Sequence, residues 1–324
     1  MAQNMKVLRA ACAALALGLG SGAPLAQDKV KVGVFPVSSS LPFFVALERG
    51  FFKDQNIDAE MVRLIGGPPN VSALITNQID ASAVLVTIEG MNANLKKPGV
   101  AMYISVNGQN ARYQMEQFVV RKGLTVRTLA DLKGKKIMSA PGPANVSMAK
   151  AVLAIAGLKE GDYTIDQLDM GQHVNAMTAG TFDAGYTLEP NAATMRKLGV
   201  ATTLEAGVIA KYVLGDPNAN AWVAGGVIST DFMKNRPEVA RRFAAAWLRA
   251  VDFINASPAE ARKHLVKNTF TPPDVVDTVP LVKFTRAADL TNRDLEDFQA
   301  FIDYSTRLGT LPERVEVTKY LQRF

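Results

Sequence analysis

One short turn occurs twice in the sequence, and its residue types suit the binding of an anionic or strongly polar group. Residues 67–72 read GPPNVS, and residues 142–147 read GPANVS. Glycine lets a ligand approach the backbone, proline stiffens the turn, and the first turn of a helix presents unpaired N–H groups at its positive end. Two such turns facing each other would hold one solute between them, with Gly67, Asn70 and Asn145 as contacts. The alternative is that Asn70 and Asn145 only cap their helices.

The loop after the first expected strand offers hydroxyl groups and an aromatic pair. Ser39 and Ser40 lie in the segment PVSSSLP, where their hydroxyls either donate hydrogen bonds to a ligand or simply form a polar loop. Phe43 and Phe44 open the next expected helix. We expect Phe43 to stack on the ligand and the other ring to enter the core.

Two titratable side chains are further candidates for solute contact. His173 begins an expected helix and either contacts the ligand or caps the helix at the surface. Glu189, in TLEP, either binds the cationic part of a zwitterion or pairs with a lysine to steady its part of the fold. His264 is expected on a helix surface, far from His173 in the sequence, so the histidines have no metal-ligand spacing. We therefore expect no metal and no cofactor.

The N-terminal segment has the order of a secretory signal peptide. Lys6 and Arg9 precede an apolar run over residues 10–19, and the small-residue stretch GSGAPLAQ follows. The run is too short to span a bilayer, which takes roughly 20 apolar residues. We predict that residues 1–26 are a signal peptide cleaved near Ala26, and that the mature chain is exported to the periplasm.

Composition narrows the classes of function. The chain has 324 residues, of which 48% are hydrophobic and 20% charged, and its formal charge is +6, values typical of a soluble globular protein. The single cysteine, Cys12, lies in the expected signal peptide, so the mature chain has no thiol for a disulfide, a metal site or a nucleophile. Lysine and arginine are scattered and not interleaved with aromatic residues, which argues against nucleic acid as a partner.

Alternation of strands and helices predicts an α/β protein with a largely parallel sheet. The first series of expected strands covers residues 30–34, 58–65, 80–86 and 100–106. A second series covers residues 116–122, a strand ending at Ala140, and residues 163–169 and 182–190. Because the plan restarts, we expect two similar lobes, which would make the repeated turn a structural duplication.

The last part of the chain changes to amphipathic helices. In residues 237–257 one face carries apolar residues at spacings of three and four: Val239, Phe243, Trp247, Ala250 and Ile254. Two further helices are expected in PAEARKHLVKN and TNRDLEDFQAFIDYSTRLG. We expect a first lobe of residues 27–110 and 222–324, a second lobe of residues 111–221, and two crossings between them.

Five segments, in this order, carry a resemblance to a known family: FFVALERGFFKDQNIDAEMV, ALITNQIDAS, FVVRKGLTVRTLADLKGKKI, MTAGTFDAGYTLEP and NRPEVARRF. From about residue 28 to its end, the chain resembles the periplasmic solute-binding proteins of ABC importers. Within them it is most similar to the branch of aliphatic-sulfonate, taurine and nitrate binders and the thiamine-precursor group. The resemblance implies a type II periplasmic-binding-protein fold, with two α/β lobes, a central cleft, two hinge crossings, and C-terminal helices on the first lobe.

By position, the resemblance also implies which loops line the cleft: residues 38–43, 67–72, 86–87, 107–110, 142–147, 172–173 and 187–190. These loops add further candidate contacts, namely Val71, Thr87, Asn107, Gln109, Val146 and Ser147. Several relatives have tryptophan before the Glu-Pro pair. This chain has Leu188 there, so any contact made by that indole is missing.

The function implied is that of a non-catalytic receptor, which captures a small polar solute and delivers it to the membrane permease of an ABC transporter. We expect a monomer and an anionic solute such as a sulfonate or carboxylate; a pyrimidine or thiamine-precursor-like heterocycle is the alternative. Two enzyme families with a similar fold, a pyrimidine-precursor synthase and a desulfinase, use cysteine chemistry that the mature chain lacks. A Ser/His/Asp triad stays open, because triads are recognised by geometry.

Overall fold

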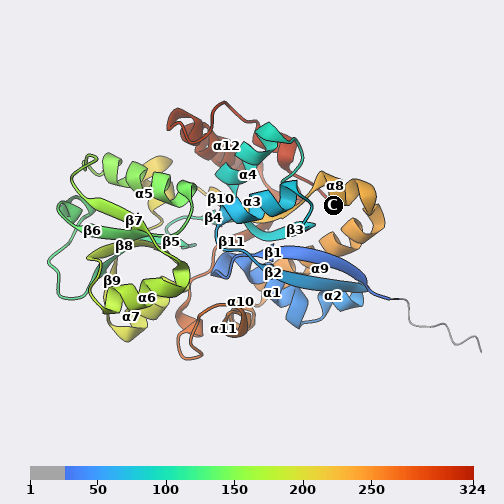
Figure 1. Cartoon of the computed structure of the whole chain (residues 1–324), viewed down its shortest axis with the longest axis horizontal. Helices are drawn as coiled ribbons and strands as arrows, with labels where there is room; N and C mark the ends of the chain where they lie inside the picture. The colour runs from blue at the N-terminus through green and yellow to red at the C-terminus, as the bar shows by residue number, and fades with distance from the viewer. Residues whose placement is uncertain (1–25) are drawn as a thin grey trace, which may run out of the picture.

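The computed structural model describes residues 26–324. Residues 1–25, which make up nearly all of the expected signal peptide, lie outside the described residues. The described chain forms two β-sheets, each flanked by helices (Figure 1). None of the helices in this part of the chain is long and apolar enough to cross a membrane.

The first sheet has six strands in the order β11-β4-β10-β3-β1-β2. Its strands are β1 (Asp28–Val34), β2 (Ile57–Arg63), β3 (Ala81–Val86), β4 (Met102–Gln109), β10 (Ala221–Ile228) and β11 (Lys283–Arg286). β1 pairs in parallel with β2 and β3, whereas β10 is antiparallel to β3 and β4, and β11 is antiparallel to β4. The expected largely parallel sheet is therefore mixed. The reason is that β4 runs toward the second sheet and β10 returns from it.

The second sheet has five strands in the order β7-β6-β8-β5-β9. Its strands are β5 (Glu116–Arg121), β6 (Lys136–Ser139), β7 (Thr164–Gln167), β8 (Ala184–Leu188) and β9 (Ala201–Ala206). β6 pairs in parallel with β7 and β8, and β5 is antiparallel to β8 and β9. β9 was not expected from the sequence, because this partly exposed edge strand lacks a regular apolar alternation.

Helices cover both sheets (Figure 1). The α-helices are α1 (Leu41–Glu48), α2 (Phe51–Asp54), α3 (Gly67–Ile75), α4 (Thr87–Lys96), α5 (Pro143–Ile155), α6 (Met170–Thr178), α7 (Asn191–Leu198), α8 (Thr230–Asn235), α9 (Pro237–Ala256), α10 (Pro258–Arg262), α11 (His264–Asn268) and α12 (Asn292–Arg307). Short 3-10 turns are η1 (Ser38–Ser40), η2 (Leu129–Leu132), η4 (Val276–Thr278), η5 (Ala287–Asp289) and η6 (Val317–Tyr320), and η3 (Ile209–Val213) is a π-helical turn. The helix expected in PAEARKHLVKN is split into α10 and α11.

The C-terminal helices pack on the first sheet, as expected. α9 lies against α1 and α2, and α12 lies against β10 and α4. The predicted apolar face of α9 is buried over its full length: Val239, Phe243, Trp247, Ala250 and Ile254. Phe243 stacks on Phe52 with ring centroids 5.1 Å apart, and Trp247 Nε1 donates to Ser105 Oγ of β4 at 2.9 Å. Because burying one large apolar side chain contributes about 1.5–3 kcal/mol, this face anchors the helix to the sheet.

Two crossings join the sheets, through residues 110–115 and 207–220. They are bonded to each other, since the Ala111 N–H donates to Pro217 O at 2.9 Å and Asn110 Nδ2 donates to Asn220 Oδ1 at 2.9 Å. Gly207 has φ +64, and a Cβ there would lie 2.8 Å from the Asn110 carbonyl carbon. The predicted boundary at residues 110/111 lies in the first crossing, and the one at residues 221/222 lies at the start of β10. The division into two lobes that move as units stays a prediction.

Candidate functional site

A cavity of about 30 Å³ lies between the two sheets, and both contribute to its lining. We call it the cleft. From the first-sheet side it is lined by Phe35, Val37, Ser39, Val84, Val86, Asn107, Val223, Ala224 and Val282, and from the second by Met115, Glu116, Asn145 and Leu188. This volume is close to that of one water molecule, whereas pockets for organic ligands measure about 300 Å³ or more. A solute can therefore enter only if the two parts separate.

Two amides of β4 carry buried atoms that are free to bind a ligand. Asn107 Nδ2 donates to Ser39 O at 3.1 Å, and its Oδ1 has no partner within residues 26–324. Gln109 Oε1 accepts the Glu116 N–H at 3.2 Å, which leaves its Nε2 without a partner in the same part of the chain. Because alternate strand residues share a face, Asn107 and Gln109 point to the same side of β4.

A carboxyl and a phenol of the second sheet complete this group. In the described chain, Glu116 Oε2 and the Tyr186 hydroxyl are buried without a hydrogen-bond partner. Burial raises the pKa of Glu116 to about 8. Burial also raises the pKa of Tyr186 well above its usual value, and the nearby charge of Glu116 adds to this effect. Leu188 pairs with Glu116 across the sheet and is two residues from Tyr186, so all three lie on one face.

These unpaired atoms mark the cleft as a binding site. Six buried side-chain polar atoms lack a partner in residues 26–324; two belong to Asn107 and Glu116, which line the cleft, and two belong to Gln109 and Tyr186, which lie on the same strand faces as these residues. Buried polar atoms are nearly always hydrogen-bonded, and leaving one unpaired costs about 1–3 kcal/mol. A solute that pairs with these atoms would remove that cost.

The charge of the lining limits what it binds. Asn107 Oδ1 only accepts hydrogen bonds, Gln109 Nε2 only donates, and the Tyr186 hydroxyl can do both. Because the pKa of Glu116 is raised to about 8, its carboxyl keeps its proton at neutral pH and can both donate and accept. No lysine or arginine is among the described residues that line the cleft. Within the same residues, no group of three or more histidine, cysteine, aspartate or glutamate side chains is placed to hold a metal ion. The cleft thus offers hydrogen-bond donors and acceptors to a small polar ligand, without a basic side chain in its lining.

Larger surface hollows offer fewer such groups. One of about 530 Å³ lies between α5 and the chain near Leu308, and one of about 340 Å³ lies beside Arg112 and Arg262. Of the unpaired buried atoms found in the described chain, none belongs to the lining of either hollow. We therefore place the candidate site in the cleft.

The two repeated turns begin α3 and α5, and their asparagines make the same hydrogen bond. Asn70 Nδ2 donates to Gly66 O at 2.8 Å, and Asn145 Nδ2 donates to Pro141 O at 2.7 Å. Each side chain thus binds the carbonyl four residues earlier and does not cap a helix N–H group. Asn70 Oδ1 also accepts from the Ser82 hydroxyl at 2.9 Å. Asn145 lines the cleft, whereas Asn70 is fully buried behind its turn.

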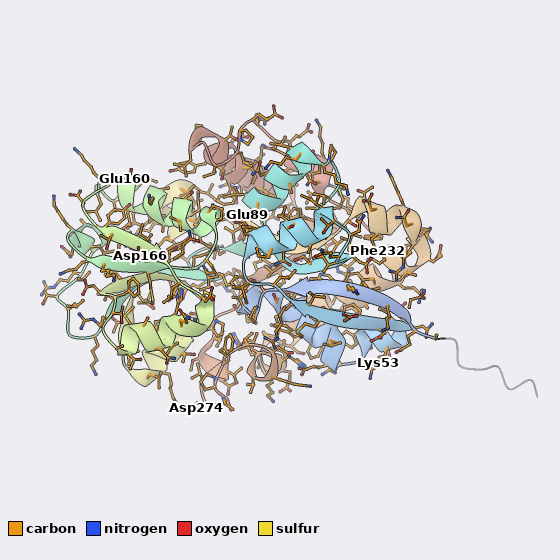
Figure 2. All side chains as sticks on the ribbon, in the orientation of Figure 1. Lys53, Glu89, Glu160, Asp166, Phe232 and Asp274 are labelled. Carbon is orange, nitrogen blue, oxygen red and sulfur yellow. The ribbon has the colours of Figure 1, made fainter. Side chains whose placement is uncertain are left out.

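The two turns face each other across a side chain of the protein itself. Figure 2 labels Glu89 of α4 at the junction between α3 and α5. A Cβ on Gly67 would lie 1.2 Å from Glu89 Oε2, and a Cβ on Gly142 would lie 3.2 Å from Oε1. Burial raises the pKa of Glu89 to about 7, and a hydrogen bond from the Ala144 N–H partly offsets this rise. A carboxyl of this chain thus lies between the two turns, where the sequence predicted an anionic or strongly polar solute.

Two other predicted contact residues, Ser40 and Phe43, lie behind the lining of the cleft and support it. The Ser40 hydroxyl donates to Phe35 O at 2.6 Å, so it fixes the loop after β1. Phe43 and Phe44 are both fully buried, with Phe43 also 5.8 Å from Phe52 between ring centroids. Both rings therefore belong to the core, whereas the sequence suggested that one of them stacks on the ligand.

Four more candidates lie away from the lining. The Thr87 hydroxyl donates to Trp222 O at 2.8 Å and ties the start of α4 to β10. Val71 lines a groove between α3 and α4, and Ser147 lines the hollow near Leu308. Val146 is half-buried on α5 beside Asn145. These residues stay predicted contacts for an opened cleft.

His173 is fully buried, and both of its ring nitrogens have partners. Nε2 lies 2.9 Å from Leu168 O, and Nδ1 lies 2.8 Å from the Thr187 hydroxyl. A carbonyl oxygen can only accept, so Nε2 carries the proton and the hydroxyl donates to Nδ1. Burial lowers the pKa of His173, which keeps the ring neutral. The ring joins α6 to β8.

Glu189 is also fully engaged inside the second sheet's part of the chain. Its carboxylate accepts from Arg196 at 2.9 Å, from Gln117 at 2.6 Å and from the Ala193 N–H at 3.0 Å. Burial raises its pKa, and the Arg196 charge opposes that rise. Of the two roles given by the sequence, the structure thus shows the steadying one, with an arginine instead of a lysine.

Sequence reasoning missed three residues of this region, namely Glu89, Glu116 and Tyr186. Glu116 opens β5 directly after a predicted crossing, and an acid at the buried start of a strand is the signal that could have identified it. Glu89 lies in the first turn of α4, where an acid is ordinary because it suits the helix dipole. Leu188, noted in place of an expected tryptophan, lines the cleft.

Several known proteins are similar to this chain, and two relatives illustrate the similarity in sequence. A Brucella abortus (strain 2308) protein, named as a binding protein, is 24% identical over 218 residues, which cover 67% of this chain and 64% of that relative. The chain thus spans less than two thirds of this relative's length. YtlA of Bacillus subtilis (strain 168), also named as a binding protein, is 23% identical over 318 residues, covering 92% of this chain and 89% of YtlA.

Structural similarity and a family match agree with these relatives. The alkanesulfonate-binding protein SsuA of Xanthomonas axonopodis pv. citri, solved with MOPS bound, is 22% identical and has a TM-score of 0.71, over 91% of this chain and 98% of SsuA. This likeness shows that the chain has the periplasmic-binding-protein fold. A family model described as "NMT1/THI5 like" matches residues 38–261. The match covers more than half of the chain, and the chain belongs to the NMT1/THI5-like family.

Proposed function

We propose that this protein is a receptor that captures a small polar solute in the cleft and delivers it to the permease of an ABC importer. One observation carries the proposal: the lining of a cavity between the two sheets includes two buried side-chain oxygens, Asn107 Oδ1 and Glu116 Oε2, that have no partner within residues 26–324. The family membership supports it, as do relatives named as binding proteins. Export through the predicted signal peptide, a periplasmic location and a monomeric state belong to the same proposal.

Capture requires the cleft to open and close about the two crossings. The bonds across the cleft are few and easily exchanged for water: the Ser38 N–H donates to Glu189 O at 3.2 Å, and the Ser38 hydroxyl contacts Met115 Sδ at 3.3 Å. The cavity of about 30 Å³ is too small for an organic solute to enter as it stands. Opening would break these bonds, and closing on a solute would restore them.

The cleft favours a neutral solute that both donates and accepts hydrogen bonds, such as the nitrogen heterocycle left open by the sequence. Asn107 Oδ1 would accept from an N–H group of the solute, Gln109 Nε2 would donate to a ring nitrogen or carbonyl, and the protonated Glu116 carboxyl could do either. An anionic sulfonate or carboxylate is the second candidate, favoured by the fold similarity to an alkanesulfonate-binding protein. That solute would need its counter-charge from residues outside the present lining.

A non-catalytic role fits the side chains that could act in a reaction. The ring nitrogens of His173 are both used within the protein, so the imidazole is not free to act as a general base. Glu189 is held by three donors. These contacts support binding without chemistry as the function.

The test is to identify the solute and locate its contacts. Mass spectrometry of gently purified residues 27–324 would detect a co-purified molecule, and thermal-shift assays would compare aminopyrimidines, amines, sulfonates and carboxylates. A solute at 100 times its dissociation constant adds about 2.7 kcal/mol of stability, so we expect a Tm increase of roughly 5 °C for the true class. Glu116→Ala, which removes this carboxyl from the lining, should weaken binding of the solute at least about fivefold. If no molecule co-purifies and no class raises the Tm, the receptor proposal fails.

A further inference from the structure

The contact between the repeated turns has a feature that solute binding does not explain. Glu89 belongs to α4, on the first-sheet side, and residues 142–144 begin α5, on the second-sheet side. The Glu89 carboxyl nevertheless lies against Gly67 of one turn and Gly142 of the other, and accepts a hydrogen bond from the Ala144 N–H. One buried acid therefore bridges both copies of the turn (Figure 2).

The two turns differ at a single position, and that position meets Glu89. GPPNVS and GPANVS are identical except for Pro69 in the first turn and Ala144 in the second. Proline has no N–H group, so the first turn cannot donate there, whereas Ala144 donates to Glu89. Because of this difference, the donor of the hydrogen bond lies on the second-sheet side and the acceptor lies on the first-sheet side.

The glycines make room for the carboxyl. A Cβ on Gly67 would lie 1.2 Å from Glu89 Oε2, so no other residue fits there unless the carboxyl moves. At Gly142 the space is tight but open, with 3.2 Å to Oε1. The first turn thus provides the space that the carboxyl occupies, and the second turn provides the hydrogen-bond donor.

We propose that Glu89 is a positioning residue for closure. Its carboxyl accepts a hydrogen bond from the Ala144 N–H across the cleft, and it thereby holds the start of α5, with Asn145, over the cavity. The Glu89–Ala144 contact forms only when the two parts come together, so it stabilises the closed arrangement relative to the open one. The Glu89 carboxyl also occupies the space between the starts of α3 and α5, where an anionic solute would otherwise bind. This proposal goes beyond solute capture and does not depend on which solute binds.

The experiment measures the distance between the two parts in the protein without added solute. The mature chain has no cysteine, so Lys53→Cys and Asp166→Cys introduce two label sites for single-molecule energy transfer. Both residues are exposed and lie on opposite sides of the cleft (Figure 2). The labelled pair reports the fractions of closed and open molecules directly.

Ala144→Pro is the decisive variant, because it removes one N–H and copies the sequence of the first turn. Proline is tolerated in the first turn of a helix, and the first turn already carries it in this place. Losing the hydrogen bond should lower the ratio of closed to open molecules by about fivefold. Ala144→Gly keeps the N–H and should retain the closed fraction, and exposed Glu60→Gln on β2 is the control for a lost surface charge.

A second pair of variants tests the acceptor. Glu89→Gln keeps an oxygen that can accept the Ala144 N–H and should stay mostly closed, whereas Glu89→Ala should open to the same extent as Ala144→Pro. Circular dichroism confirms that each variant is folded. The proposal is overturned if folded Ala144→Pro shows the same distances as Ala144→Gly. It is also overturned if the unsubstituted protein shows only separated distances. Neither result bears on whether a solute binds, so failure of the receptor function remains distinguishable.

Discussion

A buried carboxyl, one oxygen of which has no partner in the described part of the chain, makes the stability of this protein depend on pH. The pKa of Glu116 is raised by burial to about 8, from an ordinary value of 4.5. The folded protein therefore holds this proton more tightly than the unfolded chain does. Stability is complete below the ordinary pKa and falls as the pH rises toward about 8. The pKa of Glu89 is raised to about 7, so this carboxyl also makes the stability fall as the pH rises. Glu89 lies beside the Tyr103 phenol and lines one groove with Lys96.

Glu116→Gln should remove most of this dependence. The amide has the same shape and does not ionise, so we expect the variant to gain free energy of unfolding relative to the unsubstituted protein between pH 5 and pH 8. Urea unfolding at both values measures the gain, and Glu60→Gln, which alters an exposed acid, is the control. An equal difference at pH 5 and pH 8 would show that Glu116 is already solvated in the folded protein.

At this scale the sequence predicted part of the lining and missed the rest for a definite reason. Ser39 follows a strand and Asn145 opens a helix, and such positions lie at a cleft. Asn107 was implied by the family resemblance as a residue after the strand, although β4 continues to Gln109. Glu116 and Tyr186 lie within strands, where alternation predicts a face but not what covers it. Both side chains are buried because the first crossing brings β5 of the second sheet next to the end of β4 in the first sheet. No local sequence pattern predicts this arrangement.

At the scale of elements, the two copies of the repeated turn have the same local structure but different surroundings. α3 and α5 both begin after a glycine with positive φ, +84 at Gly66 and +104 at Gly142, and both use an asparagine to bind the carbonyl before the helix. Asn70 then joins Ser82 inside the first-sheet part, whereas Asn145 faces the cleft. The same residue type should therefore have different effects when removed.

Asn70→Ala should mainly reduce stability, and Asn145→Ala should mainly reduce affinity. The first loses two buried hydrogen bonds, worth about 1 kcal/mol each, away from the solute. The second loses one hydrogen bond and a side chain of the lining, so solute binding should weaken by about fivefold or more. Urea unfolding and calorimetric titration with the identified solute separate the two effects. Equal losses of affinity in both variants would mean that the turns act together on the solute.

The mixed sheets show what strand patterns leave undetermined. Sequence patterns located β1 to β8 and the long helix α9, and most of these elements have a buried apolar face. They did not locate β9 or β11, which are short or partly exposed, nor β10, which runs antiparallel to its neighbours. Strand direction follows from the path of the chain between the sheets, and so from contacts far apart in the sequence.

At the scale of the whole molecule, the contacts that join the two parts are sparse on the side away from the crossings. Lys197 and Asp274 lie 3.8 Å apart with both side chains largely exposed, and a surface ion pair of this kind contributes about 0–1 kcal/mol. The Phe270 ring is 59% exposed and lies over Gly171 of α6. The crossings, in contrast, are hydrogen-bonded to each other. This distribution of contacts predicts a hinge at the crossings and an opening at the opposite rim.

Small-angle X-ray scattering tests that motion. The cavity of about 30 Å³ cannot take up a solute while closed, so solute-free molecules must spend time in an open, more extended form. A saturating solute should shift the population toward the closed form and lower the radius of gyration, because it binds atoms of both parts at once. The forward scattering gives the molecular mass and should correspond to one chain with and without solute. A radius of gyration that stays constant while calorimetry shows full binding would mean that the two parts are rigid, and that the solute enters by some smaller rearrangement of the loops around Ser39 and Asn145.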